Sequence, residues 1–262
     1  MFVAPNWEKV NDIIKEAVFL DYCNEKNISI KDRIIKLGAC VFNNPFKEER
    51  AYRQMFFGTS FSQIILPGIM HDTRYVNRDK FLLCERLAHP GEVAFEIGAN
   101  AGIFAGYLAS LGWKVISFDP SKSIGKYLRK NVELFPNSTM EDKAISCQTG
   151  LLDFYDVTDY PKYSSVQQSS NATKYVVCGV TLDDYIRKNK IYPRFIHIGF
   201  HESVVPILQG GSRYIESNTP ELLIEETSNN SELVIQCIKK ISNKYFIVCK
   251  DDWVYAYQCD GA

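Results

Sequence analysis

The chain has 262 residues and a formal net charge of −1, with 46% hydrophobic and 23% charged residues. This composition is ordinary for a globular protein, and a chain of this length can bury a sizeable core. The near-neutral charge gives no basis for electrostatic capture of nucleic acid or of an anionic membrane.

Cysteine spacing and hydrophobic run length exclude two further classes. The eight cysteines are scattered, without a C-x-x-C pair or a histidine cluster at zinc spacing, so we predict reduced thiols and no metal site. No stretch reaches the ~20 apolar residues of a membrane span. Asn6, Glu8 and Lys9 interrupt any apolar run of a signal peptide. We therefore expect a cytoplasmic protein that binds neither membrane nor nucleic acid.

Residues 1–78 are predicted to form an N-terminal helical extension. Apolar residues recur at helical spacing over 7–22 and, less regularly, over 30–41, and a third candidate helix covers 47–57. Helices ahead of a nucleotide-binding sheet often cover its ligand edge. The extension is therefore interpreted either as a substrate cap or as a packed structural addition. The second domain is predicted to span 79–262.

The stretch from Val93 to Asp119 reads as a strand, a glycine turn, an apolar helix and a second strand. This order is half of a nucleotide-binding βαβ unit. Gly98 and Gly102 allow a sharp turn and the close approach of a ligand, with helix N–H groups pointing into the space above the turn. An acidic residue ends each strand, Glu96 on the first and Asp119 on the second.

The acids beside this turn indicate the kind of ligand. The spacing is G-x-x-x-G with an acid two residues earlier, and no Gly-Lys-Ser/Thr follows. A carboxylate at Glu96 would repel a pyrophosphate but suit a cation, and S-adenosylmethionine (SAM) carries a sulfonium and an ammonium and no phosphate. Asp119 lies where a carboxylate grips the two ribose hydroxyls. The alternative is a glycine turn that binds nothing.

A helix and a short strand follow the second acid. Ser121 can cap a helix running to about Leu134, and a strand is predicted over 138–141. Asp142 would lie just past this strand, where an acid or its neighbour could bond the adenine amino group; the alternative is a solvated loop acid. Strands over 150–155 and 175–180 resemble a hairpin whose polar connecting loop we interpret as a mobile lid.

The remaining elements alternate between helix and strand. Thr181 is predicted to cap a short helix. Further strands are predicted over 194–198, 222–225, 245–249 and 253–258, and helices over 203–217 and 231–241. This alternation predicts an α/β fold with a doubly wound, Rossmann-like sheet, mostly parallel with an antiparallel C-terminal edge.

From about residue 79 to 226 the order of motifs resembles the FkbM-type SAM-dependent methyltransferases. The first motif of that family is similar to Phe95–Gly102, with Glu96 in place of Asp, and its F-E-P motif to Phe118–Pro120. The runs 129–134 and 181–185 are similar to two later family segments. The resemblance implies a class I methyltransferase fold and O-methylation of a hydroxyl on a small molecule or glycan. The residues expected to hold SAM are Glu96, Gly98, Ala99, Asn100, Gly102, Asp119 and Asp142.

The fourth predicted strand departs from the family pattern I-K-I-D-[VI]-E-G. Gly199 replaces the Asp, and His201 replaces the Glu. Alignment of the acceptor supplies up to roughly 7 to 11 kcal/mol, whereas a general base adds about 10² to 10⁴ in rate. Loss of these acids would therefore slow methyl transfer without forbidding it. An imidazole can accept a hydroxyl proton at neutral pH, so His201 is the predicted base; the alternative is a packed strand-end residue. His197 is assigned no role.

Two hypotheses follow from different functional classes. In the first, the protein is a SAM-dependent methyltransferase with a small-molecule or sugar acceptor. This hypothesis is compatible with a homo-oligomer. In the second, it keeps the fold but serves as a binding or partner subunit without turnover. An NAD-linked oxidoreductase is disfavoured by the missing third glycine and the absent catalytic Lys or Tyr pattern. A glycine at position 199 would also leave a larger cavity above that strand.

Overall fold

The computed structural model describes residues 80, 83–84, 86–157, 164, 166, 172–199, 204–225, 231–250 and 253–258. The predicted N-terminal extension lies outside these residues, as does most of the predicted lid loop. The domain boundary at residue 79 and the two interpretations of the extension therefore stay predictions.

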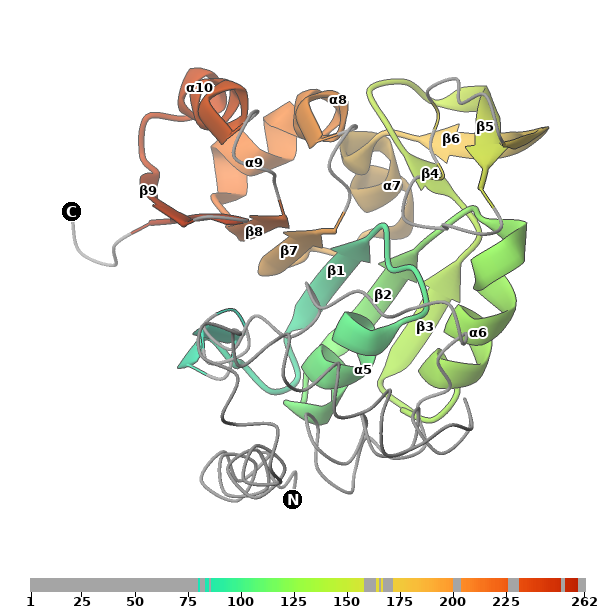
Figure 1. The fold of residues 1–262 in the computed structure, drawn as a ribbon. Coiled ribbons are helices and arrows are strands. Elements are labelled where there is room, and N and C mark those ends of the chain that lie inside the picture. Colours follow the sequence, from blue (N-terminus) through green and yellow to red (C-terminus); the bar gives the residue numbers. More distant parts are fainter. Residues whose placement is uncertain are drawn as a thin grey trace, which may run out of the picture.

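Seven strands form the central sheet, in the order β3-β2-β1-β7-β8-β10-β9 (Figure 1). Neighbours from β3 to β8 pair in parallel, and β10 pairs antiparallel with both β8 and β9. The predicted doubly wound sheet with an antiparallel C-terminal edge is confirmed. The strands are β1 (Val93–Ile97), β2 (Lys114–Phe118), β3 (Ser138–Glu141), β7 (Phe195–Ile198), β8 (Glu221–Glu225), β9 (Phe246–Lys250) and β10 (Trp253–Tyr257).

The strand order reverses between β1 and β7. The chain proceeds outward from β1 to β3 and then returns to place β7 on the other side of β1. In open α/β sheets, ligands bind at such a switch point, in the crevice outside the carboxyl ends of the strands. The carboxyl ends of β1, β2 and β7 are therefore where a functional site is expected.

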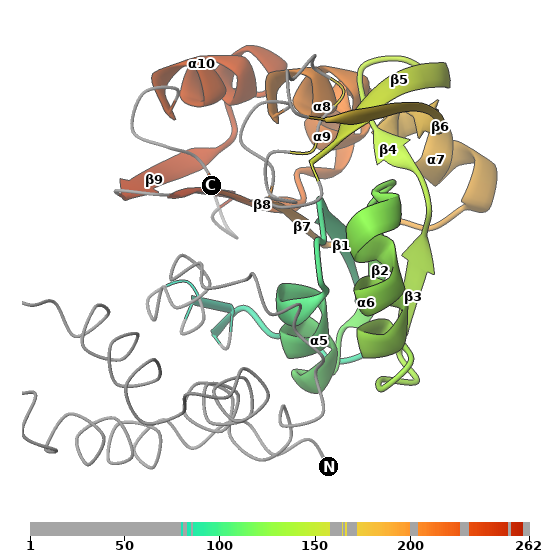
Figure 2. The ribbon, with the colours of Figure 1, turned by 45° about the vertical axis from the view of Figure 1, so that its right-hand side comes forward.

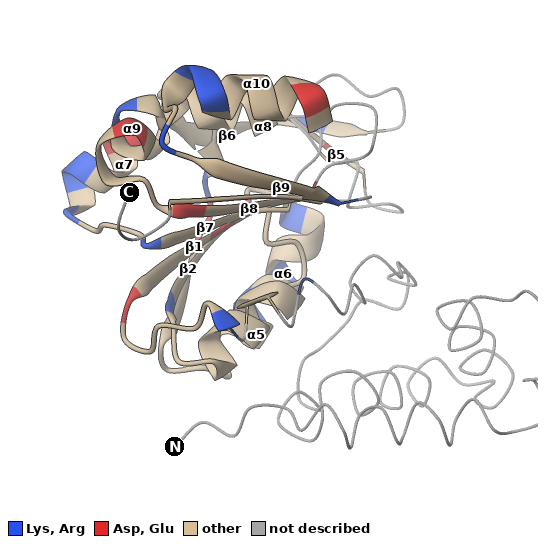
Figure 3. Cartoon of the chain, turned by 90° about the vertical axis from the view of Figure 1, so that its left-hand side faces the viewer, with Lys and Arg blue, Asp and Glu red and all other residues tan. Residues whose placement is uncertain are grey.

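Helices cover both faces of this sheet (Figures 1 and 2). The helices on one face are α5 (Ile103–Ser110) and α6 (Lys122–Val132), and those on the other are α7 (Leu182–Asn189), α8 (Val204–Gly210), α9 (Ser212–Asn218) and α10 (Ser231–Ile241). All residues of α5 are buried, as expected for a helix that is apolar all round. Charged residues occur on α6, α7, α9 and α10 (Figure 3). No described helix is long and apolar enough to cross a membrane.

Strand alternation divides the hydrophobic core into two clusters. On β1, Phe95 and Ile97 face α7 to α10, whereas Ala94 faces α5. Side chains of neighbouring strands follow the same alternation, because parallel strands in register present matching residues to one face. Glu96 and His197 consequently share the α5 face with apolar residues such as Phe195.

The predicted hairpin is confirmed and belongs to a second, smaller sheet. β5 (Gly150–Asp156) and β6 (Thr173–Val180) pair antiparallel. A third strand, β4 (Ala144–Ile145), pairs in parallel with β6 and was not predicted. Two residues are too few to show a period-2 pattern, so this strand left no signal in the sequence.

Both predicted helix caps are confirmed. Ser121 Oγ accepts a hydrogen bond from the Ile124 N–H at 3.2 Å, and Thr181 Oγ1 accepts one from the Asp184 N–H at 3.0 Å. The prediction of one helix over 203–217 is wrong, because α8 ends at Gly210 and α9 begins at Ser212. A Cβ at Gly210 would lie 2.2 Å from the Ser146 carbonyl oxygen, so the break coincides with a close backbone approach.

Candidate functional site

The turn between β1 and α5 contains three residues in the left-handed region. The φ angles are 73° at Gly98, 51° at Asn100 and 82° at Gly102. Glycine adopts such angles without steric cost, and asparagine tolerates them better than most residues do. The predicted sharp turn is therefore present, and it lies at the switch point of the sheet.

The N–H groups of this turn are already bonded within the protein. Those of Gly98 and Ala99 both donate to the Phe118 carbonyl, at 2.9 and 3.2 Å. The Asn100 N–H donates to Asp119 Oδ2 at 2.8 Å, and the Gly102 N–H to the Ala99 carbonyl at 2.8 Å. These four N–H groups point toward β2 and into the turn itself, so they are not available to a bound anion. The helix N–H groups expected to face the space above the turn belong to the start of α5, and that expectation stays a prediction.

Gly102 serves helix packing as well as the turn. A Cβ at this position would lie 2.8 Å from Leu128 Cδ1 on α6. One helical turn further along, the buried Asn131 donates from Nδ2 to the Ala101 carbonyl at 2.6 Å. α6 therefore supports the turn from behind. This role of Asn131 was not predicted, although the residue lies within the 129–134 run of the family resemblance.

Asp119 directs its carboxylate at the glycine turn. Its Oδ2 accepts from the Asn100 N–H, and its Oδ1 accepts from the Ser121 N–H at 2.9 Å. The residue is only 8% exposed, and burial raises the pKa of Asp119 to about 7 against the opposing effect of both N–H groups. Asp119 therefore titrates near neutral pH.

Asp156, at the end of β5, closes the other side of the α6 N-terminus. Its Oδ1 accepts from the hydroxyls of Ser121 and Ser123, and its Oδ2 accepts from the Ser123 N–H and the Tyr175 hydroxyl. Burial alone would raise the pKa of Asp156, but these hydrogen bonds hold it below its usual value. The small sheet is thereby fastened beside Asp119, a link that the sequence analysis did not predict.

Glu96 belongs to a buried group of charges. Its Oε2 lies 2.8 Å from His197 Nδ1, and the two residues are 2% and 1% exposed. On the far side of the imidazole, Nε2 lies 3.4 Å from Glu225 Oε1, and Lys80 pairs with the same oxygen. A separation of 3.4 Å is long for a hydrogen bond, so we treat the Nε2 contact as an ion pair.

Burial and charge act in opposite directions in this group. Burial raises the pKa of Glu96, and His197 only partly offsets that effect. Burial would raise the pKa of Glu225, but Lys80 and His197 hold it well below its usual value. Burial would lower the pKa of His197, but the two carboxylates together raise it. In the described ranges, no set of three or more His, Cys, Asp or Glu could hold a metal ion.

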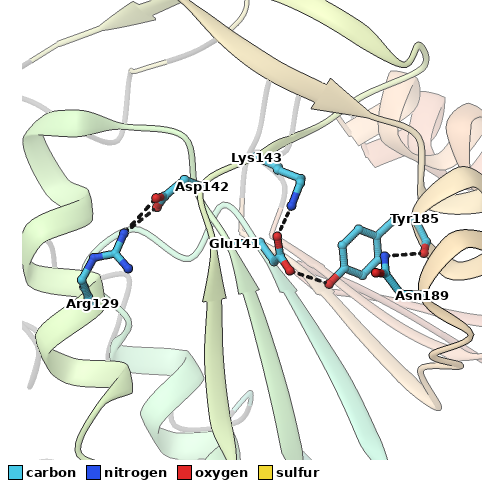
Figure 4. A network of polar contacts seen from close by, with 6 residues as sticks. All are labelled: Arg129, Glu141, Asp142, Lys143, Tyr185 and Asn189. Atoms are coloured by element: carbon cyan, nitrogen blue, oxygen red, sulfur yellow. Dashed lines mark hydrogen bonds and ion pairs between the residues drawn. The ribbon is translucent and has the colours of Figure 1, made fainter.

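The carboxyl end of β3 carries two acids that point in different directions (Figure 4). Asp142 is 64% exposed and forms a bidentate pair with Arg129 Nη2 at 2.8 and 3.1 Å. Glu141 accepts from the Tyr185 hydroxyl at 3.0 Å and pairs with Lys143. The adenine contact predicted for Asp142 stays a prediction, and its side chain is already held by an ion pair on the α6 side.

The tip of β7 approaches the glycine turn closely. The Gly199 N–H donates to the Ile97 carbonyl at 2.8 Å, and a Cβ at Gly199 would lie 3.2 Å from the Gly98 carbonyl oxygen. The missing side chain therefore accommodates the turn, and the larger cavity predicted above this strand stays a prediction. His201, the predicted base, lies outside the described residues, and its role stays a prediction.

Comparison with known proteins gives similarity in fold. No protein-family model and no curated protein matches the sequence. A methyltransferase FkbM from Methylobacillus flagellatus KT is similar in structure, with a TM-score of 0.49, 15% identity and coverage of 96% of this chain. The chain spans 59% of that protein's length.

Two further solved structures are similar at comparable levels. An O-methyltransferase from Bacillus cereus in complex with SAH has a TM-score of 0.42 and 11% identity, over 95% of this chain and 100% of that one. A precorrin-6y C5,15-methyltransferase from Geobacter metallireducens GS-15 has a TM-score of 0.44 and 13% identity, over 70% and 86%. TM-scores below 0.5 and identities of 11 to 15% do not support an activity, so any assignment of function rests on the residues of the site.

Proposed function

We propose that the protein is a SAM-dependent O-methyltransferase of the FkbM type that acts on a hydroxyl of a small molecule or glycan. One observation carries this proposal: the N–H groups of Gly98, Ala99 and Asn100 are bonded to β2 and its acid, while two buried carboxylates lie beside the turn. A pyrophosphate bound here would face the two carboxylates, and these three N–H groups would not be free to donate to it. A nucleoside that carries positive charge and no phosphate suits such a site.

The residues around Asp119 fit the ribose of SAM. Each carboxylate oxygen accepts one backbone N–H, which leaves lone pairs for two hydroxyl donors. Asn100 Oδ1 is a buried acceptor without a donor in the described part of the chain. A buried acceptor of this kind is costly unless a donor reaches it. In the proposal, Asp119 and Asn100 hold the ribose hydroxyls.

Glu96 supplies negative charge for the cationic end of SAM. Gly98, Ala99 and Gly102 shape the backbone around the nucleoside, and Asp142 or its neighbour Glu141 bonds the adenine amino group. When bound, SAM supplies a methyl group activated by a sulfonium. The role of the protein's own residues is to orient the acceptor hydroxyl and to accept its proton. His201 is the proposed base for that proton.

A catalytically impaired binding or partner subunit is the second candidate. The specific observation for it is Gly199, where the resemblance expects an acid and where a Cβ would lie 3.2 Å from the Gly98 carbonyl oxygen. This backbone leaves little room for the expected side chain. The proposed cytoplasmic location and assembly into a homo-oligomer also stay proposals.

Calorimetric titration of the full chain tests the cofactor assignment. We expect SAM and S-adenosylhomocysteine to bind, NAD⁺ not to bind, and Asp119→Ala to weaken SAM binding by about 10-fold to 100-fold, the effect of losing hydrogen bonds to a charged group. Absence of SAM binding at millimolar concentration would remove the enzyme hypothesis. Tight NAD⁺ binding would overturn the argument from the bonded N–H groups.

A methyl-transfer assay with a panel of sugars and phenols separates the two candidates. Turnover supports the enzyme, whereas SAM binding without methylation of any acceptor supports the partner subunit. Where turnover is seen, His201→Ala is expected to lower kcat by about 10² to 10⁴ if His201 is the base. Unchanged kcat excludes that role.

A further inference from the structure

His197 lies buried between two carboxylates and has no part in the function proposed above. We infer that His197 is a positioning residue that fixes the Glu96 carboxylate in the proposed cofactor site and is itself fixed by Glu225 and Lys80. The inference rests on the proposed function, because that function gives Glu96 its role. It extends the site from β1 across β7 to β8.

The register of the sheet determines which side chains can hold Glu96. Glu96 lies opposite Ser117 of β2 on one side and His197 of β7 on the other. Ser117 Oγ is buried and finds no hydrogen-bond partner among the described residues. His197 Nδ1, in contrast, lies 2.8 Å from Glu96 Oε2. The orientation of this carboxylate is therefore fixed from β7, while Oε1 is left for other donors.

The imidazole is in turn confined on its remaining sides. Its ring centroid lies 4.0 Å from that of Phe104 on α5, and its Nε2 faces Glu225 at 3.4 Å. Lys80 pairs with that carboxylate, and its Nζ lies 4.9 Å from the centroid of the Phe104 ring. A side chain held on three sides keeps one rotamer, and this gives His197 a defined direction toward Glu96.

The charges of the group alternate along this path. Glu96 from β1, Glu225 from β8 and Lys80 are the charged groups that contact or adjoin the imidazole in the described part of the chain. With the imidazole protonated, the two carboxylates are balanced by two cations. A cationic ligand would contact the Glu96 oxygen that His197 leaves open, so ligand binding and the His197 proton act on the same carboxylate and are linked reciprocally.

The first experiment measures the pair without any ligand. The full chain contains four histidines, and ¹⁵N-histidine NMR with His197→Gln as the assignment reference identifies the resonance of His197. We expect its titration midpoint above the ordinary value, and in Glu96→Gln at least about one pH unit lower than in the wild type. An unchanged midpoint would overturn the inference. Because no ligand is present, this result is independent of whether SAM binds.

The second experiment measures the consequence for binding. His197→Phe keeps a ring but removes the donor, whereas His197→Asn places an amide N–H near the position of Nδ1. We expect the Kd for SAM to rise at least about tenfold in His197→Phe and to return to within about threefold of the wild type in His197→Asn, with circular dichroism confirming the fold of both.

Equal loss in the two variants, or no loss in either, would contradict a positioning role. Should His197→Phe fail to fold, the NMR measurement on Glu96→Gln still decides the inference. If the wild type binds no SAM, the proposed function fails, whereas the pairing of His197 with Glu96 is judged by the titration alone.

Discussion

Glu96 and Asp119 are two buried carboxylates at the ends of neighbouring parallel strands, and the protein holds them in different ways. Glu96 contacts an imidazole that is linked to Glu225 and Lys80. Among the described residues, Asp119 accepts two hydrogen bonds, both from backbone N–H groups. Burial raises the pKa of both acids, but in this part of the chain Glu96 alone has a side-chain partner that can carry a full positive charge.

This difference shows which residues balance the negative charge of each acid. The charge of Glu96 is balanced by His197 on β7, which is linked to Glu225 on β8 and to Lys80, so substitutions of these side chains should affect the site. Within the described part of the chain, Asp119 accepts from the backbone N–H groups of Asn100 and Ser121, and every substitution there except one to proline keeps these N–H groups. Glu96 is therefore sensitive to distant substitutions, and Asp119 is sensitive mainly to pH.

Of the changes considered, removal of the Lys80 cation, which pairs with Glu225, should have the largest effect on the free energy of unfolding. Lys80→Met leaves the largely buried Glu225 with the imidazole as its remaining charged partner among the described residues, and breaking a buried pair by removing one member costs about 3 to 5 kcal/mol. We expect the free energy of unfolding in urea to fall by that amount. The matched control Lys114→Met, at an exposed position of β2, should change it by less than about 0.5 kcal/mol. A loss below about 1 kcal/mol in Lys80→Met would show that the group is not tightly coupled.

Asp119→Asn should change the pH dependence of stability. The folded-state pKa of Asp119 is about 7 and its unfolded value is near 3.8, so the folded state holds the extra proton between these values. The stabilisation of the folded state by protonated Asp119 is fully present below about pH 4 and is lost as the pH rises through about 7. The stability of the wild type relative to Asp119→Asn should therefore fall by about 2 to 4 kcal/mol over this window.

Urea midpoints of both proteins from about pH 4 to pH 8 measure this slope. The asparagine also changes two hydrogen bonds, but that offset is independent of pH, so only the slope reports the titration. Parallel curves for the two proteins would show that Asp119 is ionised throughout.

Asp142 sharpens the comparison because it is the exposed acid at the end of the third strand. Its pair with Arg129 is solvent-exposed, so Asp142→Asn should change the free energy of unfolding by less than about 1 kcal/mol. If Asp142 bonds adenine, the same variant should weaken SAM binding by about 3-fold to 10-fold. Arg129→Gln breaks the same pair and keeps the carboxylate, so its affinity should stay near the wild type. Equal affinities in the two variants would argue against the adenine contact.

The sequence predicts the fold well because the relevant signals are local. Strand β3 and helix α10 have the predicted bounds. A period-3.6 pattern is complete within α10, and β3 directly follows the local Pro136-Asn137 turn signal. The break between α8 and α9 was missed, and it coincides with the close approach of Gly210 to Ser146, which lies 64 positions earlier in the chain and leaves no local signal.

The candidate site is only partly predictable for the same reason. The glycines and the two acids are visible in the sequence, and the predicted glycine turn is present in the structure. Strand alternation implies that His197 lies on the opposite face from Ile196 and Ile198, but it cannot show that Glu96 and Glu225 lie beside it. That neighbourhood depends on the order of β1, β7 and β8 in the sheet, which no local pattern encodes.

The carbonyl of Phe118 accepts hydrogen bonds from two successive N–H groups of the glycine turn. A shorter fragment of the protein that stops before β2 would contain both glycines of the turn and still lack the carbonyl oxygen that accepts the hydrogen bonds of the turn. During synthesis on the ribosome, this bend therefore has to wait until the second strand has emerged and aligned with the first, about twenty residues later.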